Sequence, residues 1–166
     1  RTGLPWKDKL NGSYDPYKIW VSEMMLQQTR VASVLPKFNQ FIRKFPDVEK
    51  LANSTLEDVI QVWAGLGYYR RARNLYEGAK IIVNELGKIF PKNAAEWSTI
   101  PGIGMSTSAA ISSFVNGEKV ALLDANVYRV LCRRYCLELT NSRAKEKKQL
   151  MKFCLLYTSD AADDVE

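Results

Sequence analysis

One glutamate, Glu23, has the type and spacing expected of a general acid. The 166-residue sequence contains no His, which excludes Ser-His-Asp and Cys-His nucleophile systems and His-ligated zinc or haem. Acid–base catalysis must then fall to carboxylates, Lys, Tyr or Cys. Helical spacing places Trp20 and Leu26 on the side of Glu23, and apolar surroundings would raise the pKa of its carboxyl group. The simpler alternative is a Glu23 that points outward or pairs with Arg30 or Lys18.

A second carboxylate, Asp124, follows the apolar run 120–123 and precedes a predicted helix. The positive end of that helix would favour its ionised form. A fixed carboxylate of this kind can stabilise a sugar that is becoming cationic. The alternative is an ordinary helix cap. Since Glu23 and Asp124 lie far apart in the sequence, only the fold could bring them together.

The segment 100–107 reads Ile-Pro-Gly-Ile-Gly-Met-Ser-Thr and predicts a tight hairpin between two helices. Gly102 and Gly104 allow a sharp turn and a close approach to a ligand immediately before a helix N-terminus. Exposed N–H groups there would hold a DNA phosphate, which positions a protein without reading sequence. The alternative is a plain helix–helix turn.

Two further segments combine polar and aromatic residues, Gln-Gln-Thr at 27–29 and Gly-Leu-Gly-Tyr-Tyr-Arg-Arg at 65–71. Gln side chains reach base edges, and a Tyr after a glycine turn can wedge between bases. The pair Arg70 and Arg71 is interpreted here as a phosphate contact. Surface amides and core aromatics are the ordinary alternatives.

Apolar residues recur at helical spacing nearly throughout, and no alternating run of convincing strand length is present. The fold class predicted is therefore all-α. Helices are expected twice within 17–45, around 56–63, over 69–86, on either side of the hairpin at 95–100 and 106–116, over 126–137 and near 143–155.

Charge and cysteine content narrow the function classes. The net charge is +6, and because residues 155–166 hold four acidic residues and no basic one, the rest carries 24 basic against 14 acidic residues, or +10. Such a surplus favours a polyanionic partner. Three Cys without a C-x-x-C pair argue against a disulfide framework or zinc ribbon. No apolar run approaches the ~18 residues of a membrane span and no signal peptide opens the chain, so a soluble, intracellular protein is expected.

Several of these motifs together resemble one family. Leu-Pro-Trp at 4–6, Trp-Val-Ser-Glu-Met-Met-Leu-Gln-Gln-Thr at 20–29, the segment 65–75, the hairpin and Leu-Asp-Ala-Asn-Val-Tyr-Arg-Val at 123–130 are similar to adenine DNA glycosylases of the MutY type. These belong, with endonuclease III, to the helix-hairpin-helix superfamily. The resemblance, over about 3–137 in order, implies removal of adenine opposite 8-oxoguanine or guanine in double-stranded DNA, with the adenine flipped out.

The resemblance also implies roles for individual residues. Glu23 would protonate the adenine, Asp124 would stabilise the oxocarbenium-like sugar or bond to it transiently, and water would complete hydrolysis. Ser106 stands where bifunctional lyases carry a catalytic Lys, so excision without efficient strand cleavage is expected. The base pocket would be bordered by Leu4, Trp6, Lys7 and Ser106, and the DNA would be contacted by Gln27, Gln28, Thr29, Tyr68, Arg70, Gly102, Gly104, Ser106, Thr107 and Asn126.

On the same resemblance, 15–128 forms a central six-helix-type domain with the helix-hairpin-helix at about 94–116. Residues 1–14 and 129–155 form part of a second helical domain, and 156–166 looks like a non-native tail. The family's 4Fe-4S cluster is not expected here, because Cys132, Cys136 and Cys154 do not match its four-Cys loop. The resemblance implies an internal fragment that also lacks the C-terminal domain used to recognise 8-oxoguanine.

Two alternatives stay open. One is another enzyme of the superfamily, a mismatch thymine or uracil glycosylase or an endonuclease III type lyase, although Ser106 argues against the lyase and the 27–28 Gln pair favours adenine. The other is a non-catalytic helix-hairpin-helix DNA-binding module, which gives no reason for Glu23 in an apolar helical face. In each case a monomer in the cytoplasm, associated with the nucleoid and not with membranes, is expected.

Overall fold

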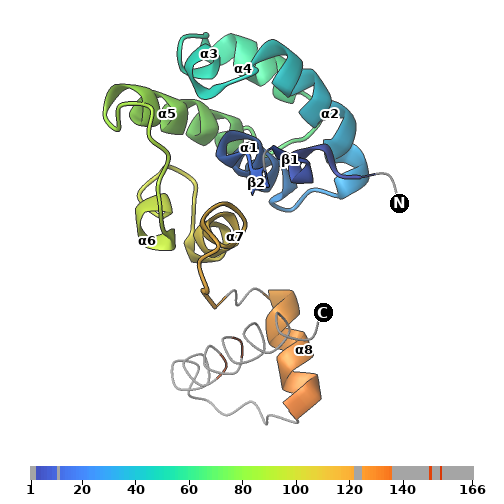
Figure 1. Ribbon diagram of the computed structural model, residues 1–166. Helices are drawn as coiled ribbons and strands as arrows, with labels where there is room; N and C mark the ends of the chain where they lie inside the picture. The colour runs from blue at the N-terminus through green and yellow to red at the C-terminus, as the bar shows by residue number, and fades with distance from the viewer. Residues whose placement is uncertain (1–2, 11, 122–124, 136–149, 151–153, 155–166) are drawn as a thin grey trace.

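The computed structural model describes residues 3–10, 12–121, 125–135, 150 and 154 (Figure 1). These residues are mainly helical, which confirms the predicted fold class. The elements in chain order are η1 (Pro5–Lys7), β1 (Lys9–Leu10), β2 (Ser13–Tyr14), α1 (Pro16–Leu26), α2 (Val31–Lys44), α3 (Val48–Ala52), α4 (Leu56–Trp63), α5 (Arg70–Asn84), α6 (Ala94–Trp97), α7 (Met105–Asn116) and α8 (Ala125–Tyr135).

Four of the helices, α1, α3, α4 and α6, begin at side chains that accept hydrogen bonds from their first backbone N–H groups. Asp15 caps α1, accepting from the Tyr17 N–H at 2.9 Å, and Pro16 occupies the first helical position, where no N–H is needed. Thr55 caps α4 by accepting from the Asp58 N–H at 3.1 Å. Local chemistry therefore fixes where these helices start, independently of what they pack against.

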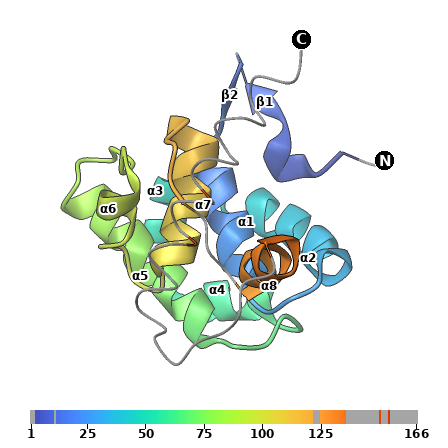
Figure 2. The same ribbon diagram turned by 90° about the horizontal axis from the view of Figure 1, so that it is seen from below.

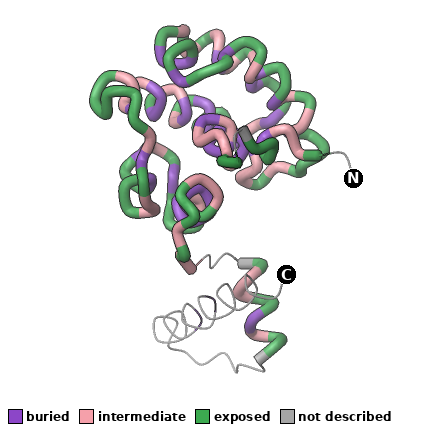
Figure 3. The backbone as a smooth tube through the Cα atoms, in the orientation of Figure 1, coloured by how far each residue is buried: buried purple, intermediate pink, exposed green. Residues whose placement is uncertain are grey.

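Helix α1 is the central element of the core. It packs against α2, α5 and α7, and Figures 1 and 2 show it enclosed by these helices. Its side chains Ile19, Trp20, Val21, Met24 and Met25 are almost fully buried. Buried residues therefore line much of α1, whereas the outer helices carry exposed faces (Figure 3). Each fully buried apolar side chain contributes about 1.5–3 kcal/mol.

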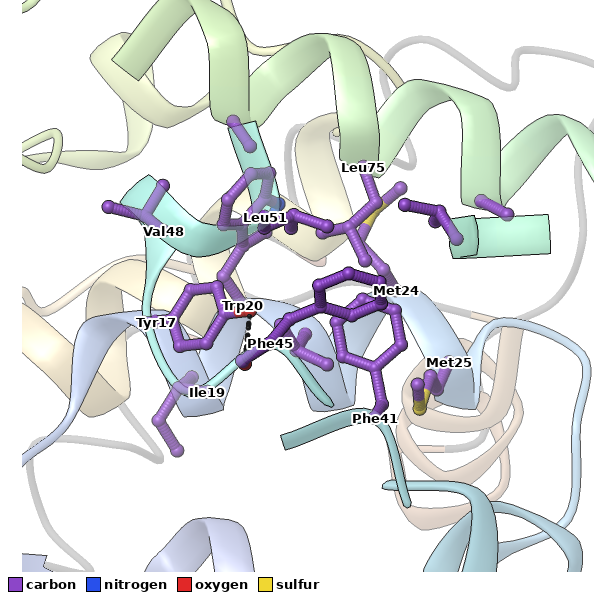
Figure 4. Packing of buried hydrophobic residues seen from close by; sticks show 14 of the residues in the cluster. Tyr17, Ile19, Trp20, Met24, Met25, Phe41, Phe45, Val48, Leu51 and Leu75 are labelled. Carbon is purple, nitrogen blue, oxygen red and sulfur yellow. Dashed lines mark hydrogen bonds between the residues drawn. The ribbon is translucent and has the colours of Figure 1, made fainter. Parts of the chain in front are cut away.

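Aromatic residues fill the space between α1 and its neighbours (Figure 4). Phe41 lies 4.9 Å from Phe45 and 6.2 Å from Trp63 between ring centroids. The Tyr17 hydroxyl donates to the Phe45 carbonyl at 2.9 Å, which satisfies a buried polar group. This packing makes α1 a rigid support for any side chain that it carries.

The observed elements differ from the predicted ones in a few places. The two-residue antiparallel strands β1 and β2, which pair Lys9 with Tyr14, were not predicted, because two residues are too short for alternation to register. Helix α3 was also missed, being only five residues long. Helix α6 ends at Trp97 rather than continuing to residue 100. The helix predicted near 143–155 lies largely outside the described residues.

Leu131 of α8 packs with Leu150 and Cys154 in a second, smaller apolar cluster. Among the described residues, no helix combines the length and apolar character needed to cross a membrane.

Candidate active site and nucleic-acid interface

Glu23 occupies a position on α1 where its carboxyl group is largely removed from water. Its neighbours Ser22 and Met24 are fully buried, and Glu23 itself is half-buried. Burial raises the pKa of this carboxyl group, while the positive charge of Lys7 lowers it in part. Burial is the larger effect, so the acid form persists to higher pH than for an ordinary Glu. The carboxyl group makes no ion pair with any described cation.

Three elements meet around Glu23. Lys7 extends from η1, and its ammonium lies 4.8 Å from the centre of the Phe114 ring on α7. Trp6, in the same turn, is only 2% exposed and packs edge-on against Phe38 at 5.1 Å. Leu4 is half-buried beside this core. The pocket roles of Leu4, Trp6 and Lys7 stay predictions; η1 carries Trp6 and Lys7, and Leu4 is its N-terminal flanking residue.

The raised pKa of Glu23 predicts a pH-dependent stability difference. The folded state binds the Glu23 proton more tightly than the unfolded state, so this group costs stability as pH rises from ~4.3 through its folded pKa. Glu23→Gln removes that cost, so we expect the variant to gain stability relative to the wild type at pH 8 compared with pH 4. Urea unfolding of both proteins at the two pH values measures the gain. An equal difference at both would contradict a buried, protonated Glu23.

Gln27 links the end of α1 to the hairpin. Its amide nitrogen donates to the Gly102 carbonyl at 3.2 Å and to the Thr107 hydroxyl at 3.3 Å. Because Gln27 lies one turn beyond Glu23, the hairpin meets the same side of α1 that carries the acid. Gln27 was predicted to probe a base edge, but its amide nitrogen is occupied by the hairpin. The neighbouring Gln28 is exposed, so it is better placed than Gln27 to contact a base edge.

The hairpin itself is a rigid turn between α6 and α7. Ile100 and Ile103 are buried and anchor it to the core, and the Ile103 N–H donates to the Ile100 carbonyl at 3.2 Å. Gly102 has a φ of +77°, in the left-handed region. Gly104 caps α7 without a side chain. Ser106 is exposed and Thr107 half-buried in the first turn of α7, whose N–H groups are suited to an anion.

Gly102→Ala should destabilise the hairpin. An added Cβ would lie 2.6 Å from the Asn74 side-chain nitrogen, and the φ of +77° disfavours any L side chain. The expected loss is about 1–3 kcal/mol, measured by thermal unfolding. Gly104→Ala is the matched control: its added Cβ would meet nothing within 4 Å, so a loss below about 1 kcal/mol is expected. Equal losses in the two variants would contradict the assigned strain at Gly102.

Arg71 is buried, so the prediction that it contacts phosphate is wrong. It is 7% exposed, and its guanidinium donates to protein acceptors on two separate segments. One terminal nitrogen donates to the carbonyls of Met24, Met25 and Gln27, and the other to the Thr29 hydroxyl and the carbonyls of Leu66 and Gly67, all at 2.7–3.2 Å.

Helical spacing could have revealed the burial of Arg71. It lies on the stripe of α5 that also carries the buried residues Leu75, Ala79 and Ile82. Spacings of three and four residues place all of them on one helix face. Its neighbour Arg70 lies off this stripe and is exposed, so a phosphate contact remains a prediction for Arg70 alone.

Gln28 and Tyr68 share an unusual backbone conformation. Their φ angles are +56° and +48°, in the left-handed region that non-glycine residues adopt at a cost of about 1–2 kcal/mol. Both side chains are exposed, Tyr68 by 63%. Strain of this kind persists only where surrounding structure enforces it, and it concentrates at functional sites. Lys88, which lies outside the predicted site, is also exposed with a positive φ of +69°. At Gln28 and Tyr68 this backbone conformation occurs where the side chains are predicted to contact DNA.

Two predicted site residues, Asp124 and Asn126, flank the start of α8, and the structure describes only Asn126. Asn126 is exposed on α8 and accepts a hydrogen bond from the Arg129 guanidinium. Asp124, the predicted partner of Glu23, lies outside the described residues. Its role stays a prediction.

The residues present do not fit the iron–sulfur cluster associated with the family resemblance. A 4Fe-4S cluster is usually held by four Cys thiolates, and the chain has three Cys in all. Cys154 is buried against Leu131 and Leu150. Within the described part of the chain, no three His, Cys, Asp or Glu side chains group as metal ligands. No cluster is therefore assigned to this chain.

The fold and site together define a class: a helical protein with a glycine hairpin and a half-buried Glu on adjacent elements. Residues 21–155 match the family described as "HhH-GPD superfamily base excision DNA repair protein". The chain belongs to this superfamily.

Curated relatives make the family resemblance more specific. The chain is 46% identical over 141 residues to an adenine DNA glycosylase of Buchnera aphidicola subsp. Baizongia pistaciae, covering 85% of this chain and 39% of the relative. It is 44% identical over 135 residues to human adenine DNA glycosylase, covering 78% of this chain and 25% of the relative. The chain thus spans about two fifths or less of these relatives.

Solved structures support the fold. A thermostable thymine-DNA glycosylase superposes with a TM-score of 0.77 at 25% identity, covering 94% of this chain and 70% of that one. A trapped endonuclease III–DNA covalent intermediate gives a TM-score of 0.74 at 22% identity, covering 83% of this chain and 65% of that one. The second likeness concerns fold alone.

Proposed function

We propose that the protein carrying this chain is a monofunctional DNA glycosylase that hydrolyses the N-glycosidic bond of adenine mispaired with 8-oxoguanine or guanine. The observation that carries the proposal is the half-buried Glu23, whose pKa is raised by burial, beside a glycine hairpin suited to phosphate. The names of relatives up to 46% identical support adenine as the base removed.

In this proposal Glu23 donates its proton to the adenine, at N7. The electron pair of the glycosidic bond then moves onto the base, which leaves as neutral adenine, and the sugar becomes oxocarbenium-like. Asp124 stabilises that positive charge as a carboxylate, and a water molecule adds to the sugar and loses a proton. Ser106 offers a hydroxyl and not an amine, so it forms no Schiff base and the strand is not cut by a lyase step.

DNA would be held by backbone groups and read by side chains. The N–H groups at Gly102, Gly104 and the first turn of α7 are suited to a phosphate. Exposed Gln28 and Tyr68 would lie against the base opposite the extruded adenine, with Arg70 on the backbone. Together these groups would contact a bent duplex from which one nucleotide is flipped out.

The test is adenine release from a duplex with adenine opposite 8-oxoguanine, by the complete protein that carries these residues. We expect release without strand cleavage until hot alkali is added. Duplexes with thymine or uracil opposite guanine test the alternative glycosylases, which the structural similarity to a thymine-DNA glycosylase also supports. Strand cleavage without alkali would favour a lyase. Binding without any base release would favour the DNA-binding module.

We also propose the organisation that the resemblance implies, a central domain over 15–128 acting as a monomer on chromosomal DNA in the cytoplasm. Analytical ultracentrifugation of the complete protein with and without duplex tests the monomer. A dimer on a single mispair would contradict it.

A further inference from the structure

The buried Arg71 joins two loops that lie about 40 residues apart in sequence. Its first terminal nitrogen donates to the carbonyls of Met24 at 3.0 Å, Met25 at 2.8 Å and Gln27 at 2.7 Å. These carbonyls belong to the end of α1, where helix carbonyls lack intrahelical partners. A cation at a helix C-terminus also interacts favourably with the helix dipole. Arg71 therefore fixes how α1 ends and how the chain enters residues 27–29.

The second terminal nitrogen fixes the other loop, between α4 and α5. It donates to the carbonyls of Leu66 and Gly67, both at 3.2 Å, and to the Thr29 hydroxyl at 3.1 Å. The Trp63 indole N–H also donates to the Gly67 carbonyl, at 3.1 Å. One planar guanidinium thus sets the distance between the two loops.

The residues held outward by these loops are Gln28 and Tyr68. Gln28 lies between Gln27 and Thr29, which both contribute acceptors to Arg71. The Tyr68 carbonyl accepts from the Arg71 backbone N–H at 2.9 Å, and the Tyr68 ring centre lies 5.5 Å from the guanidinium carbon. The Trp63 ring lies 5.4 Å from the same carbon. The backbone around both exposed residues is therefore held by contacts to the single buried residue Arg71.

We propose that Arg71 is a positioning residue for recognition of the base opposite the excised adenine, holding Gln28 and Tyr68 in register so that it sets selectivity for the mispair. This inference rests on the proposed glycosylase function. Glu23 lies before the acceptors of Arg71 on α1 and is supported by the core packing of that helix. Loss of Arg71 contacts should therefore affect selectivity and affinity more than the bond-breaking step.

Arg71→Lys and Trp63→Phe in the complete protein test this. Lys keeps the charge but lacks the planar fork that reaches both loops. Trp63→Phe keeps a buried ring and removes the N–H to Gly67, and because Trp63 is fully buried it cannot itself touch DNA. Single-turnover excision at saturating enzyme is compared for adenine opposite 8-oxoguanine and opposite guanine, together with the Kd for each duplex.

We expect Arg71→Lys to lower the ratio of the rate constant with 8-oxoguanine to that with guanine about tenfold, since misplacements of ~1 Å change rates by up to 10²-fold. Binding should weaken by a similar factor. The rate on the 8-oxoguanine duplex should fall by less than about threefold. Trp63→Phe should shift the ratio in the same direction by a smaller factor. Ile82→Ala is the control: it is buried on α5, about 16 Å along the helix from Arg71, and should lower the Tm without changing the ratio.

The outcomes separate the two proposals. Wild-type ratios in Arg71→Lys and Trp63→Phe would overturn the inference while leaving the glycosylase function intact. A ratio lowered equally by Ile82→Ala would also overturn it, because general destabilisation would then explain the change. If Arg71→Lys does not fold by circular dichroism, Trp63→Phe decides. A wild-type protein that releases adenine without preference defeats the inference alone, and one that releases none defeats both.

Discussion

Glu23→Gln should reduce adenine release by about 10²- to 10⁴-fold, the range that a positioned general acid contributes. The substitution keeps the size and planarity of the side chain and removes only the proton to be donated. The half-buried position of Glu23 on α1 raises its pKa, so the wild type retains that proton at pH values where an exposed Glu has lost it. Single-turnover excision of adenine opposite 8-oxoguanine measures the loss.

The pH profile gives an independent check. The wild-type rate should fall as pH rises through the raised pKa of Glu23, because the acid form is the active one, and the residual rate of Glu23→Gln should lack that limb. Glu77→Gln, an exposed carboxylate on α5, should keep the wild-type rate and profile. A wild-type rate in Glu23→Gln would remove Glu23 from the mechanism.

The parts of the fold that sequence could predict are those with local causes. Helix α2 carries Val34, Phe38 and Phe41 at spacings of three and four, and these residues are buried as the pattern indicates. The hairpin was predicted from its glycines, and Gly102 does adopt the left-handed backbone. Periodicity and turn chemistry act within a few residues, so a single sequence displays them directly.

The parts that could not be predicted depend on long-range contacts. The side-chain amide of Gln27 donates to the carbonyl of Gly102, 75 residues later in the chain. Without that partner, the amide would be expected to face solvent. Arg71 is charged, and charged residues are rarely buried unless their donors are satisfied. Helical spacing on α5 indicates its burial, but its acceptors on α1 lie more than 40 residues away, and no local pattern predicts them.

Helix α1 connects the predicted general acid to one of the loops predicted to contact DNA. The core helix α1 carries Glu23 on one turn and presents its last carbonyls to Arg71 on the next. The acid and the loop bearing Gln28 are therefore fixed to the same buried element. Because packed helices deform little, α1 holds the Glu23 side chain and this loop at a fixed separation.

The other large effect on the rate of adenine release is expected at Asp124, the second predicted catalytic carboxylate. Asp124→Asn should lower the rate of adenine release by about 10²- to 10³-fold, the loss typical of removing a charge-stabilising group. Asn caps helices about as well as Asp, so folding should be little changed. A neutral amide cannot stabilise an oxocarbenium-like sugar, whereas duplex binding, which precedes that charge, should persist. Single-turnover excision and a binding titration on the same duplex measure both.

The same substitution separates the two interpretations of Asp124. If Asp124 only caps a helix, Asp124→Asn should behave like Asp47→Asn, a change at the exposed cap of α3, where Asp47 accepts from the Lys50 N–H at 2.7 Å. We expect Asp47→Asn to retain the wild-type rate. Matching rates in the two variants would assign Asp124 to the fold and leave Glu23 as the only carboxylate in the chemistry. A large loss confined to Asp124→Asn would place a fixed negative charge beside the sugar, as the proposed division between a neutral and an ionised carboxyl requires.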